Sequence, residues 1–594
     1  MKTFKLNQKY ISFLFLISSI SIGCKSGSVE DIIPEAPANT VTSSFSNLKI
    51  STDKSTYKPG DDVTFTMDIS TLPTSAKVRY KYQNTALFES SITASTWKWK
   101  TPTDDYKGYI AEVYANVNNI ETVYAVIAVD VSSEWNKFPR YGFISKFDQL
   151  TDSQIDSVTS NLNRLHINGL QFYDWHNKHH KLLPLIGSTP ATSWQDIGGR
   201  TIYFSTIQKY ITSAHSYNMK SMFYDLVYGA WEYADADGVN KEWYLYKDNT
   251  HTNRDFFALN SPFLSNLYLL DPSNTGWQNY MINEVKNVYQ NLNFDGYHMD
   301  QVGNWGARYN YAGQTINFST AFQSFIDAFK AAIPTKYNVM NAVAQNGQQG
   351  IGKSTSDFMY SEVWSPSDSY NDLANIIKQN NSLSNNTKNT VLAAYMNYDM
   401  GGTAGFFNTS SVLMTDAVIF AFGGSHIEMG EHMLCKEYFP NYNLVMKDDL
   451  KKSLVNYYDF QVAYQNLLRD GGTFNTVTVA STDAKMAIDV WPASNGKVAV
   501  FGKKMDSRQV IHFINYSNST TQKWRDNTGI QVMPALIKDA KMVLTSEETV
   551  KKMWIATPDF VGGASRSLNF AQIGNKVSFI LPELRYWDMV VVEY

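Results

Sequence analysis

Two acidic residues, each at the end of a predicted strand, could form a catalytic pair of carboxylates. Asp300 ends the run Phe294-Asp-Gly-Tyr-His-Met-Asp300, and Glu362 ends the run Asp357-Phe-Met-Tyr-Ser-Glu362. Both runs are typical of buried strands. Glycosidic bond cleavage needs such a pair, because one carboxylate attacks or stabilises the anomeric carbon and the other, with a raised pKa, protonates the leaving oxygen. We therefore predict a catalytic pair whose separation, and so whose retaining or inverting chemistry, the sequence leaves open.

Further polar and aromatic side chains lie at or just beyond the ends of other predicted strands. A buried charge costs several kcal/mol unless it is paired, so polar residues repeated at these points indicate a site. In an α/β barrel, active sites lie at the carboxyl ends of the strands. The predicted substrate-binding residues are Tyr173, Asp174, Trp175, Tyr224, Tyr228, His298, Gln301, Asn341, Trp364, Asn397 and Glu428.

The roles expected of these residues follow from their chemistry. Asp174 is expected to bind hydroxyls of the sugar beside the scissile bond, and the aromatic side chains to stack on sugar rings or line the groove. His298 lies two residues before the catalytic aspartate and therefore shares its face of the strand. Gln301 and Asn341 are expected to orient hydroxyls or the nucleophile. Glu428 is expected to bind a hydroxyl or to affect the aspartate by like-charge proximity.

Alternating strand and helix patterns must position this site. The segment 134–472 shows eight such units, which predicts a (β/α)₈ barrel in the α/β class. Short alternating runs at 46–133 and 473–594 predict an N-terminal immunoglobulin-like β-sandwich and a C-terminal β-sandwich. The expected barrel strands are 141–145, 169–173, 220–224, 296–300, 337–341, 357–362, 391–395 and 417–422.

The N-terminus is typical of an exported lipoprotein. Residues 1–24 contain lysines, a short apolar run and the sequence Ser21-Ile-Gly-Cys24. The apolar run is too short to span a bilayer and is characteristic of a signal peptide. We predict lipidation of Cys24, a flexible tether over 25–45, and a location at the cell surface or on the periplasmic side of a bacterial outer membrane. Membrane contact is expected only through the lipid.

Composition excludes several functional classes. The 594 residues include 43% hydrophobic and 18% charged residues, enough for a large core and too apolar for a disordered chain. A net charge of −4 argues against nucleic acid as a partner. The sequence has no Gly-x-Ser-x-Gly motif of the kind that positions the nucleophile in many serine hydrolases. The cluster His176, His179 and His180 is interleaved with lysines, so we predict a loop cluster with no metal and no cofactor.

Several segments together resemble family 66 of the glycoside hydrolases. They are Gln171-Phe-Tyr-Asp-Trp175, Phe294–Gln301, Tyr360-Ser-Glu-Val-Trp364, and His426–Glu431 with Glu437-Tyr-Phe-Pro440. The resemblance implies a retaining enzyme acting on α-1,6-linked glucan, with Asp300 as nucleophile and Glu362 as acid/base. The family contains endo-dextranases and cycloisomaltooligosaccharide glucanotransferases. Its transferases that make cyclic products typically carry a carbohydrate-binding module inserted in the barrel, and no insertion of comparable size separates the barrel units here.

The resulting prediction is a monomeric endo-dextranase whose partners are dextran and isomalto-oligosaccharides. It would cleave internal α-1,6 bonds through a covalent glucosyl intermediate on Asp300. One alternative is a transferase that makes cyclic isomalto-oligosaccharides through the same intermediate. The other is a surface glycan-binding protein built on an inactive barrel, which the presence of both Asp300 and Glu362 disfavours.

Overall fold

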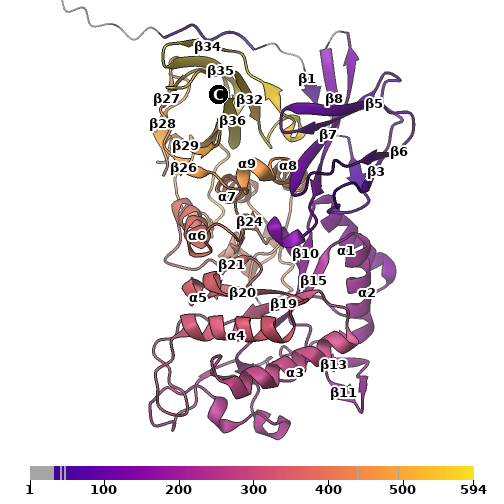
Figure 1. Cartoon of the computed structure of the whole chain (residues 1–594), viewed down its shortest axis with the longest axis vertical. Helices are drawn as coiled ribbons and strands as arrows, with labels where there is room; N and C mark the ends of the chain where they lie inside the picture. Colours follow the sequence, from indigo (N-terminus) through magenta and orange to yellow (C-terminus); the bar gives the residue numbers. More distant parts are fainter. Residues whose placement is uncertain (1–32, 40–42, 46–47, 119, 438–439, 493) are drawn as a thin grey trace, which may run out of the picture.

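The computed structural model describes residues 33–39, 43–45, 48–118, 120–437, 440–492 and 494–594. Figure 1 shows a barrel, coloured magenta to orange, beneath an indigo N-terminal and a yellow C-terminal β-sheet region. The predicted signal peptide and the predicted lipidation site Cys24 lie outside the described residues. Among the described helices, none is both long and apolar enough to cross a membrane.

An eight-stranded parallel sheet forms the barrel. The barrel closes where the first strand meets the segment just after the last one: the Phe143 N–H donates to the Met429 carbonyl over 3.1 Å, and Phe143 pairs in parallel with Gly430. The strands are, in order, β9 (Tyr141–Ile144), β10 (Gly169–Phe172), β15 (Lys220–Leu226), β19 (Gly296–Asp300), β20 (Tyr337–Val343), β21 (Met359–Glu362), β22 (Thr390–Ala393) and β24 (Ser425–His426).

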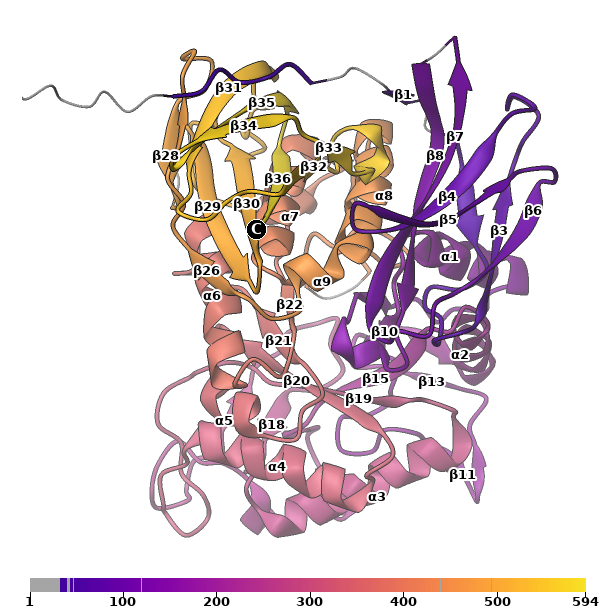
Figure 2. The same cartoon turned by 45° about the horizontal axis from the view of Figure 1, so that its top comes forward.

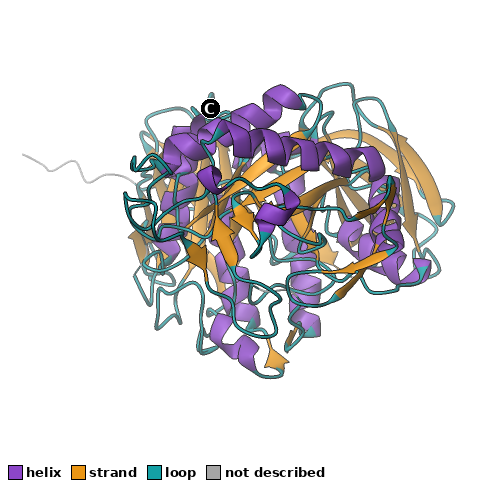
Figure 3. Cartoon of the chain, turned by 90° about the horizontal axis from the view of Figure 1, so that it is seen from below, coloured by secondary structure: helices purple, strands orange, loops and turns teal. Residues whose placement is uncertain are grey.

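A helix follows each of these strands and covers the barrel (Figure 3). The first helix has Thr151 as its N-cap residue, which forms a capping box with Gln154. The helices are α1 (Asp152–Arg164), α2 (Phe204–Ser216), α3 (Thr275–Asn291), α4 (Phe318–Ala332), α5 (Gln348–Lys353), α6 (Tyr370–Leu383), α7 (Thr409–Ala421) and α8 (Asp448–Ala463), with the short α9 (Gln465–Leu468) at the end.

The eighth predicted strand, 417–422, is wrong. Residues 417–421 form the end of α7, and the strand is β24, which begins at Ser425. Every residue of α7 from Ser410 to Ala421 is buried, because the C-terminal region covers its outer side. A helix buried on all sides has no polar stripe, and a short apolar run then looks the same in sequence as a buried strand.

The N-terminal region contains two sheets with a shared apolar core. In the larger sheet, β8 pairs with β1, although β1 lies in the predicted tether. The larger sheet contains β1 (Ser43–Phe45), β8 (Ile120–Val131), β7 (Lys107–Val117), β4 (Lys77–Tyr82) and β5 (Thr85–Ser91), and the smaller contains β2 (Ile50–Thr52), β3 (Asp62–Met67) and β6 (Thr96–Lys100).

The C-terminal region likewise has two sheets with an apolar core. One contains β26 (Thr473–Asn475), β28 (Ile488–Val490), β29 (Val498–Met505), β30 (Arg508–Asn515), β36 (Trp587–Glu593), β32 (Lys552–Ala556) and β33 (Arg566–Ser567). The other contains β27 (Val479–Ser481), β31 (Ile537–Thr545), β35 (Lys576–Leu584) and β34 (Phe570–Ile573). The domain boundaries predicted from the sequence stay predictions.

Part of the predicted tether lies on this C-terminal region (Figure 2). The Asn39 amide donates to the Ile580 carbonyl over 2.8 Å, and the Asn569 amide donates to the Ala38 carbonyl over 2.8 Å. Residues 38 and 39 are therefore tied to the surface of the protein.

Candidate active site

The strands β19 and β21 bring Asp300 and Glu362 to the same end of the barrel. Asp300 is the last residue of β19, Glu362 is the last residue of β21, and Asn341 lies on β20 between them. The Asn341 amide nitrogen is 2.8 Å from Asp300 Oδ1 and 2.8 Å from Glu362 Oε2. One NH₂ group thus donates to both carboxylates, which are at most twice that distance apart at these oxygens.

Each carboxylate also accepts from a tyrosine. The Tyr224 hydroxyl donates to Asp300 Oδ2 over 2.8 Å, and the Tyr395 hydroxyl donates to Glu362 Oε1 over 2.9 Å. Tyr224 comes from β15, and Tyr395 follows β22. Residues on or just after five neighbouring strands therefore fix the orientation of the pair.

The two carboxyl groups differ in their electrostatic surroundings. Burial raises the pKa of Asp300, opposed by hydrogen bonds from Tyr224, the Gln301 backbone and Asn341. Burial and the negative charge of Asp300 raise the pKa of Glu362 to about 7. Burial and the charge of Asp300 therefore favour a protonated Glu362, whereas the three hydrogen bonds favour an ionised Asp300.

A cavity of about 300 Å³ opens over this pair. It is lined by both carboxylates and by the predicted groove residues Tyr173, Asp174, Tyr224, His298, Gln301, Asn341 and Trp364. Apolar side chains from the segment after β15 complete one wall, namely Phe257, Leu259, Phe263 and Leu267. A cavity with aromatic walls and a few convergent polar groups is the usual form of a small-molecule or sugar site.

Asp174 is held at the cavity by an unusual backbone conformation and a nearby cation. Its φ of 48° lies in the left-handed region, and Arg200 Nη2 is 3.6 Å from its Oδ2. Burial raises the pKa of Asp174 to about 7, although Arg200 opposes this shift. Asp174 can therefore accept or donate a hydrogen bond near neutral pH.

His298 and Gln301 border the cavity, and both have contacts inside the protein. Burial lowers the pKa of His298 to about 3, so its imidazole is neutral, and its Nδ1 is 3.3 Å from the Tyr141 hydroxyl. The Gln301 amide nitrogen donates to the carbonyls of Asn341 and Asn346 over 2.8 and 2.9 Å. Gln301 therefore holds the end of β20, from which Asn341 reaches the carboxylates.

Two predicted groove aromatics lie in the core instead of the cavity wall. Trp175 has 0% exposure, and its indole N–H donates to the Tyr224 carbonyl over 3.1 Å. Tyr228 also has 0% exposure, and its hydroxyl accepts from the Val302 N–H over 3.1 Å. These contacts correct the prediction that either ring is available to stack on a sugar.

Asn397 and Glu428 are likewise committed to internal contacts and do not line the cavity. The Asn397 amide nitrogen donates to the Asp526 carbonyl over 2.8 Å, which ties the barrel to the C-terminal region. Glu428 accepts from the Tyr458 hydroxyl over 3.1 Å, and its other oxygen is 3.4 Å from His426 Nδ1. The predicted roles of Asn397 and Glu428 at the substrate are therefore corrected to roles inside the protein.

Several residues at the cavity were not predicted. Tyr395 donates to Glu362, and it is the last residue of a strand that the sequence did predict, so its position was a usable signal. Gln171 is a buried polar residue inside a predicted strand, which is a second such signal. His179, Tyr360 and Glu437 also line the cavity. The loop path that brings His179 there has no signal in the sequence.

Among the described residues, two buried groups have ligand atoms close enough for a metal ion: His176, His179 and Asp225, and also Asp416, His426 and Glu428. In the first, the His179 Nδ1 already accepts from the Trp231 indole over 3.2 Å. In the second, the His426 Nδ1 is 2.8 Å from Asp416 Oδ1. Each group thus has an internal partner for one of its nitrogens.

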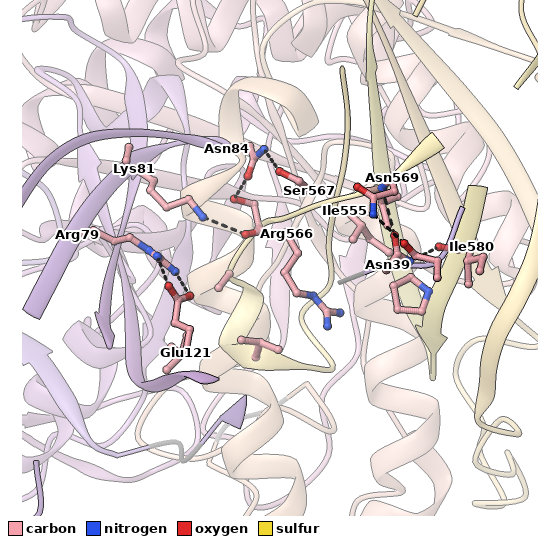
Figure 4. A pocket seen from close by; sticks show the side chains of 18 of the residues that line it. Asn39, Arg79, Lys81, Asn84, Glu121, Ile555, Arg566, Ser567, Asn569 and Ile580 are labelled. Atoms are coloured by element: carbon pink, nitrogen blue, oxygen red, sulfur yellow. Dashed lines mark hydrogen bonds and ion pairs between the residues drawn. The ribbon is translucent and has the colours of Figure 1, made fainter. Parts of the chain in front are cut away.

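A larger cavity of about 810 Å³ lies between the N-terminal and C-terminal regions (Figure 4). Arg79 there is paired with Glu121 over 2.7 Å, and Lys81 donates to the Ser565 carbonyl over 3.0 Å. Its lining contains no aromatic side chain and no carboxylate pair of the kind that hydrolysis requires. Size alone therefore does not mark the active site.

A protein-family model identifies the family to which this arrangement of residues belongs. The model described as Glycosyl hydrolase family 66 matches residues 52–591, which include all of the barrel and most of both flanking regions. The chain belongs to glycoside hydrolase family 66. The resemblance inferred from the sequence motifs is thereby confirmed.

Relatives within this family have two different activities in their names. The chain is 27% identical to a cycloisomaltooligosaccharide glucanotransferase of Niallia circulans, in an alignment of 758 positions that covers 99% of this chain and 76% of the relative. It is 22% identical to a dextranase of Streptococcus salivarius over 591 positions, covering 85% and 69%. A crystal structure of a Paenibacillus sp. cycloisomaltooligosaccharide glucanotransferase complexed with cycloisomaltoheptaose superposes with a TM-score of 0.84 and 25% identity, covering 92% of this chain and 100% of that one.

Proposed function

We propose that this family 66 glycoside hydrolase is an endo-dextranase that cleaves internal α-1,6 bonds with retention. The observation that carries the proposal is the single Asn341 amide between Asp300 and Glu362. Carboxyl groups in retaining glycosidases are about 5–5.5 Å apart, and those in inverting enzymes about 6.5–9.5 Å apart. Two oxygens that each lie 2.8 Å from one nitrogen fit the retaining spacing.

The protonation order supports a role for each carboxylate. In the first step, ionised Asp300 attacks the anomeric carbon while protonated Glu362 gives its proton to the departing glycosidic oxygen. The C–O bond to the leaving chain breaks and an ester bond to Asp300 forms. In the second step, Glu362 takes a proton from water, the water oxygen bonds to the anomeric carbon, and Asp300 leaves as a carboxylate.

The substrate proposal draws on the relatives. Their printed names refer to dextranase and to cycloisomaltooligosaccharide products, and isomalto-oligosaccharides are the fragments of an α-1,6-glucan. The aromatic rings of Tyr173 and Trp364, together with Asp174 and His298, supply the flat and hydrogen-bonding surfaces that a glucose unit needs. We propose these residues, with Tyr224, as contacts of the sugar beside the scissile bond.

Chain length separates this chain from the Niallia circulans transferase but not from the Paenibacillus sp. transferase, whose crystallised chain is covered over 100% of its length. The alignment with the glucanotransferase has 758 positions, so that relative has many residues for which this 594-residue chain has no counterpart. The longest stretch between consecutive barrel strands is 227–295, which contains β16 (Gly229–Ala230), β17 (Phe256–Phe257), β18 (Leu267–Leu269) and α3. A transferase remains the second candidate, because identity to the glucanotransferase is 27% and to the dextranase 22%.

Product analysis tests the proposal. Purified protein lacking residues 1–24 is incubated with dextran, and with pullulan and starch as comparison substrates. We expect linear isomalto-oligosaccharides from dextran only. Mainly cyclic products would identify a transferase, and binding of dextran without cleavage of any glucan would identify an inactive glycan-binding barrel.

The variant Asp300→Asn tests the nucleophile. We expect a loss of at least about 1000-fold in kcat on dextran, because the covalent intermediate can no longer form. The matched control is Asp235→Asn, which removes an exposed carboxylate outside the catalytic cavity. Wild-type turnover by Asp300→Asn would show that the nucleophile is another residue.

A further inference from the structure

A second cavity adjoins the catalytic one. It has a volume of about 640 Å³, and the Trp364 side chain lines both. One wall follows β21 and the other comes from the C-terminal region, between β30 and β31. Its lining includes Trp364, Tyr398, Asp399, Arg525 and Asn527. We call this cavity the C-terminal groove.

The C-terminal groove lies on the Glu362 side of the catalytic pair. Trp364 follows Glu362 by two residues, and the Tyr395 ring that contacts Glu362 through its hydroxyl has its centroid 5.5 Å from that of Trp364. The Tyr398 ring is 5.6 Å from Trp364 and 6.2 Å from Tyr395. Aromatic rings therefore run from Glu362 into the groove. The carboxyl group that protonates the leaving oxygen must face the chain that departs.

The outer wall of the C-terminal groove is fixed to the barrel. Arg525 Nη2 donates to the Val363 carbonyl over 2.6 Å, and the Asn397 N–H donates to the Arg525 carbonyl over 2.8 Å. The Trp524 indole donates to the Ser367 carbonyl over 2.8 Å. These bonds hold the wall in place before any ligand binds, which lowers the entropic cost of binding.

The C-terminal groove also has polar atoms without partners. Arg525 Nη1 and Asn527 Oδ1 are buried and make no hydrogen bond within the protein. The Arg525 guanidinium lies 4.7 Å from the centre of the Trp364 ring. Buried polar atoms are normally paired, so this unpaired donor and acceptor are candidates for hydrogen bonds to a ligand in the groove. Sugar hydroxyls both donate and accept, and the neighbouring aromatic rings suit the apolar face of a pyranose.

We propose that the C-terminal groove binds the α-1,6-glucan chain on the leaving-group side of the scissile bond. It holds the departing chain in the first step and receives an acceptor sugar when transfer replaces hydrolysis. This inference rests on the proposed function, because it takes Glu362 as the general acid. It assigns the segment 521–530 of the C-terminal region a part in substrate binding.

Comparing two donor substrates tests the groove. Cleavage of dextran releases a glucan chain, which the C-terminal groove would bind. Cleavage of α-isomaltosyl fluoride releases fluoride, which does not use the groove. In Asn527→Ala we expect the ratio of kcat/KM on dextran to kcat/KM on isomaltosyl fluoride to fall about fivefold, the effect of one lost hydrogen bond. Adding Asp399→Ala, an exposed residue of the same groove, should lower the ratio further.

Added isomaltose gives an independent measure. With isomaltosyl fluoride as donor, the isomaltose concentration that gives half-maximal transfer product should rise about fivefold in Asn527→Ala. The matched control is Gln522→Ala, on the same segment but outside the groove lining, where the amide contacts Asn495. Thermal unfolding verifies that each variant is folded.

The outcomes separate the two proposals. A wild-type protein that turns over neither substrate would overturn the proposed function itself. A wild-type protein active on both, with Asn527→Ala and the double variant matching Gln522→Ala in substrate ratio and acceptor concentration, would overturn the role of the groove.

Discussion

Asn341 controls both carboxylates because its amide donates to each of them. A hydrogen bond to a carboxylate stabilises the charged form and lowers its pKa. Asn341 does this for Asp300 and for Glu362, against the upward effect of burial. It also spaces two groups that would otherwise repel each other. Asn341 therefore affects both the pH range of activity and the geometry of the pair.

In Asn341→Ala both pKa values should rise, since a stabilising donor is removed from each carboxylate. The wild-type kcat/KM on dextran should fall as the pH rises through about 7, where Glu362 loses its proton. In the variant the acid and alkaline limbs should both move to higher pH, and kcat should fall roughly 10–100-fold as the pair loses its alignment. A pH profile of kcat/KM measures this.

Asn338→Ala is the matched control, because it removes a buried amide from the same strand that contacts neither carboxylate. Its pH limbs should stay at the wild-type positions. A profile of Asn341→Ala that moved to lower pH, or did not move, would contradict the bridging role.

At the residue scale, the sequence predicted the side chains whose positions depend on strand ends. It mispredicted those whose orientation depends on packing. Asp300, Glu362 and Asn341 lie where buried strands end, so their convergence follows from the barrel itself. Trp175 and Tyr228 are near strand ends too, but their side chains pack inward. The direction of such a side chain depends on the path of the loop and on neighbouring elements. The local sequence pattern does not reveal either.

At the scale of elements, the closure of the barrel depends on a close approach at Gly430. A Cβ at this position would lie 2.4 Å from the Phe143 carbonyl oxygen and 2.8 Å from its ring. Glu431, the next residue, accepts from the Ser145 N–H over 2.9 Å. Gly430 and Glu431 together join the loop after β24 to the end of β9.

Gly430→Ala should therefore separate β9 from the loop after β24. We expect the free energy of unfolding to fall by about 1–3 kcal/mol, because overpacking forces the backbone to shift. Thermal and urea unfolding measure the loss. Gly402→Ala is the control, since a Cβ there would meet nothing within 4 Å. Equal stability of the two variants would show that the closure tolerates a methyl group.

The element scale also shows where the sequence was insufficient. The strands at 296–300 and 337–341 were placed correctly because turn residues and helices with polar faces flank them. The run at 417–422 was misassigned because the partner that buries the outer side of α7 comes from residues far away in the chain. Met414, for example, is contacted by Ser519. Only tertiary packing distinguishes this helix from a strand.

At the scale of the whole molecule, α8 connects all three parts. On the N-terminal side, Asp459 accepts from the Ala128 N–H of β8 over 2.8 Å and pairs with Arg164 of α1 over 2.8 Å. On the C-terminal side, the Tyr457 hydroxyl donates to Asp559 over 3.0 Å. In Figure 2, α8 lies between the two β-sheet regions. The last helix of the barrel is thus buried by both flanking regions.

This arrangement predicts that the barrel does not fold without its C-terminal region. Removing residues 473–594 would expose α7, whose helical residues from Ser410 onward are all buried, and one side of α8. It would also remove the segment 521–530 from the C-terminal groove. We expect the shortened chain to aggregate or to bind a hydrophobic dye strongly, with no cooperative thermal transition and no dextran cleavage. Size-exclusion chromatography, dye binding and calorimetry measure these properties. A monodisperse fragment that unfolds cooperatively and cleaves dextran at the full-length rate would show instead that the barrel is self-sufficient, and that the C-terminal region contributes neither to its core nor to its substrate site.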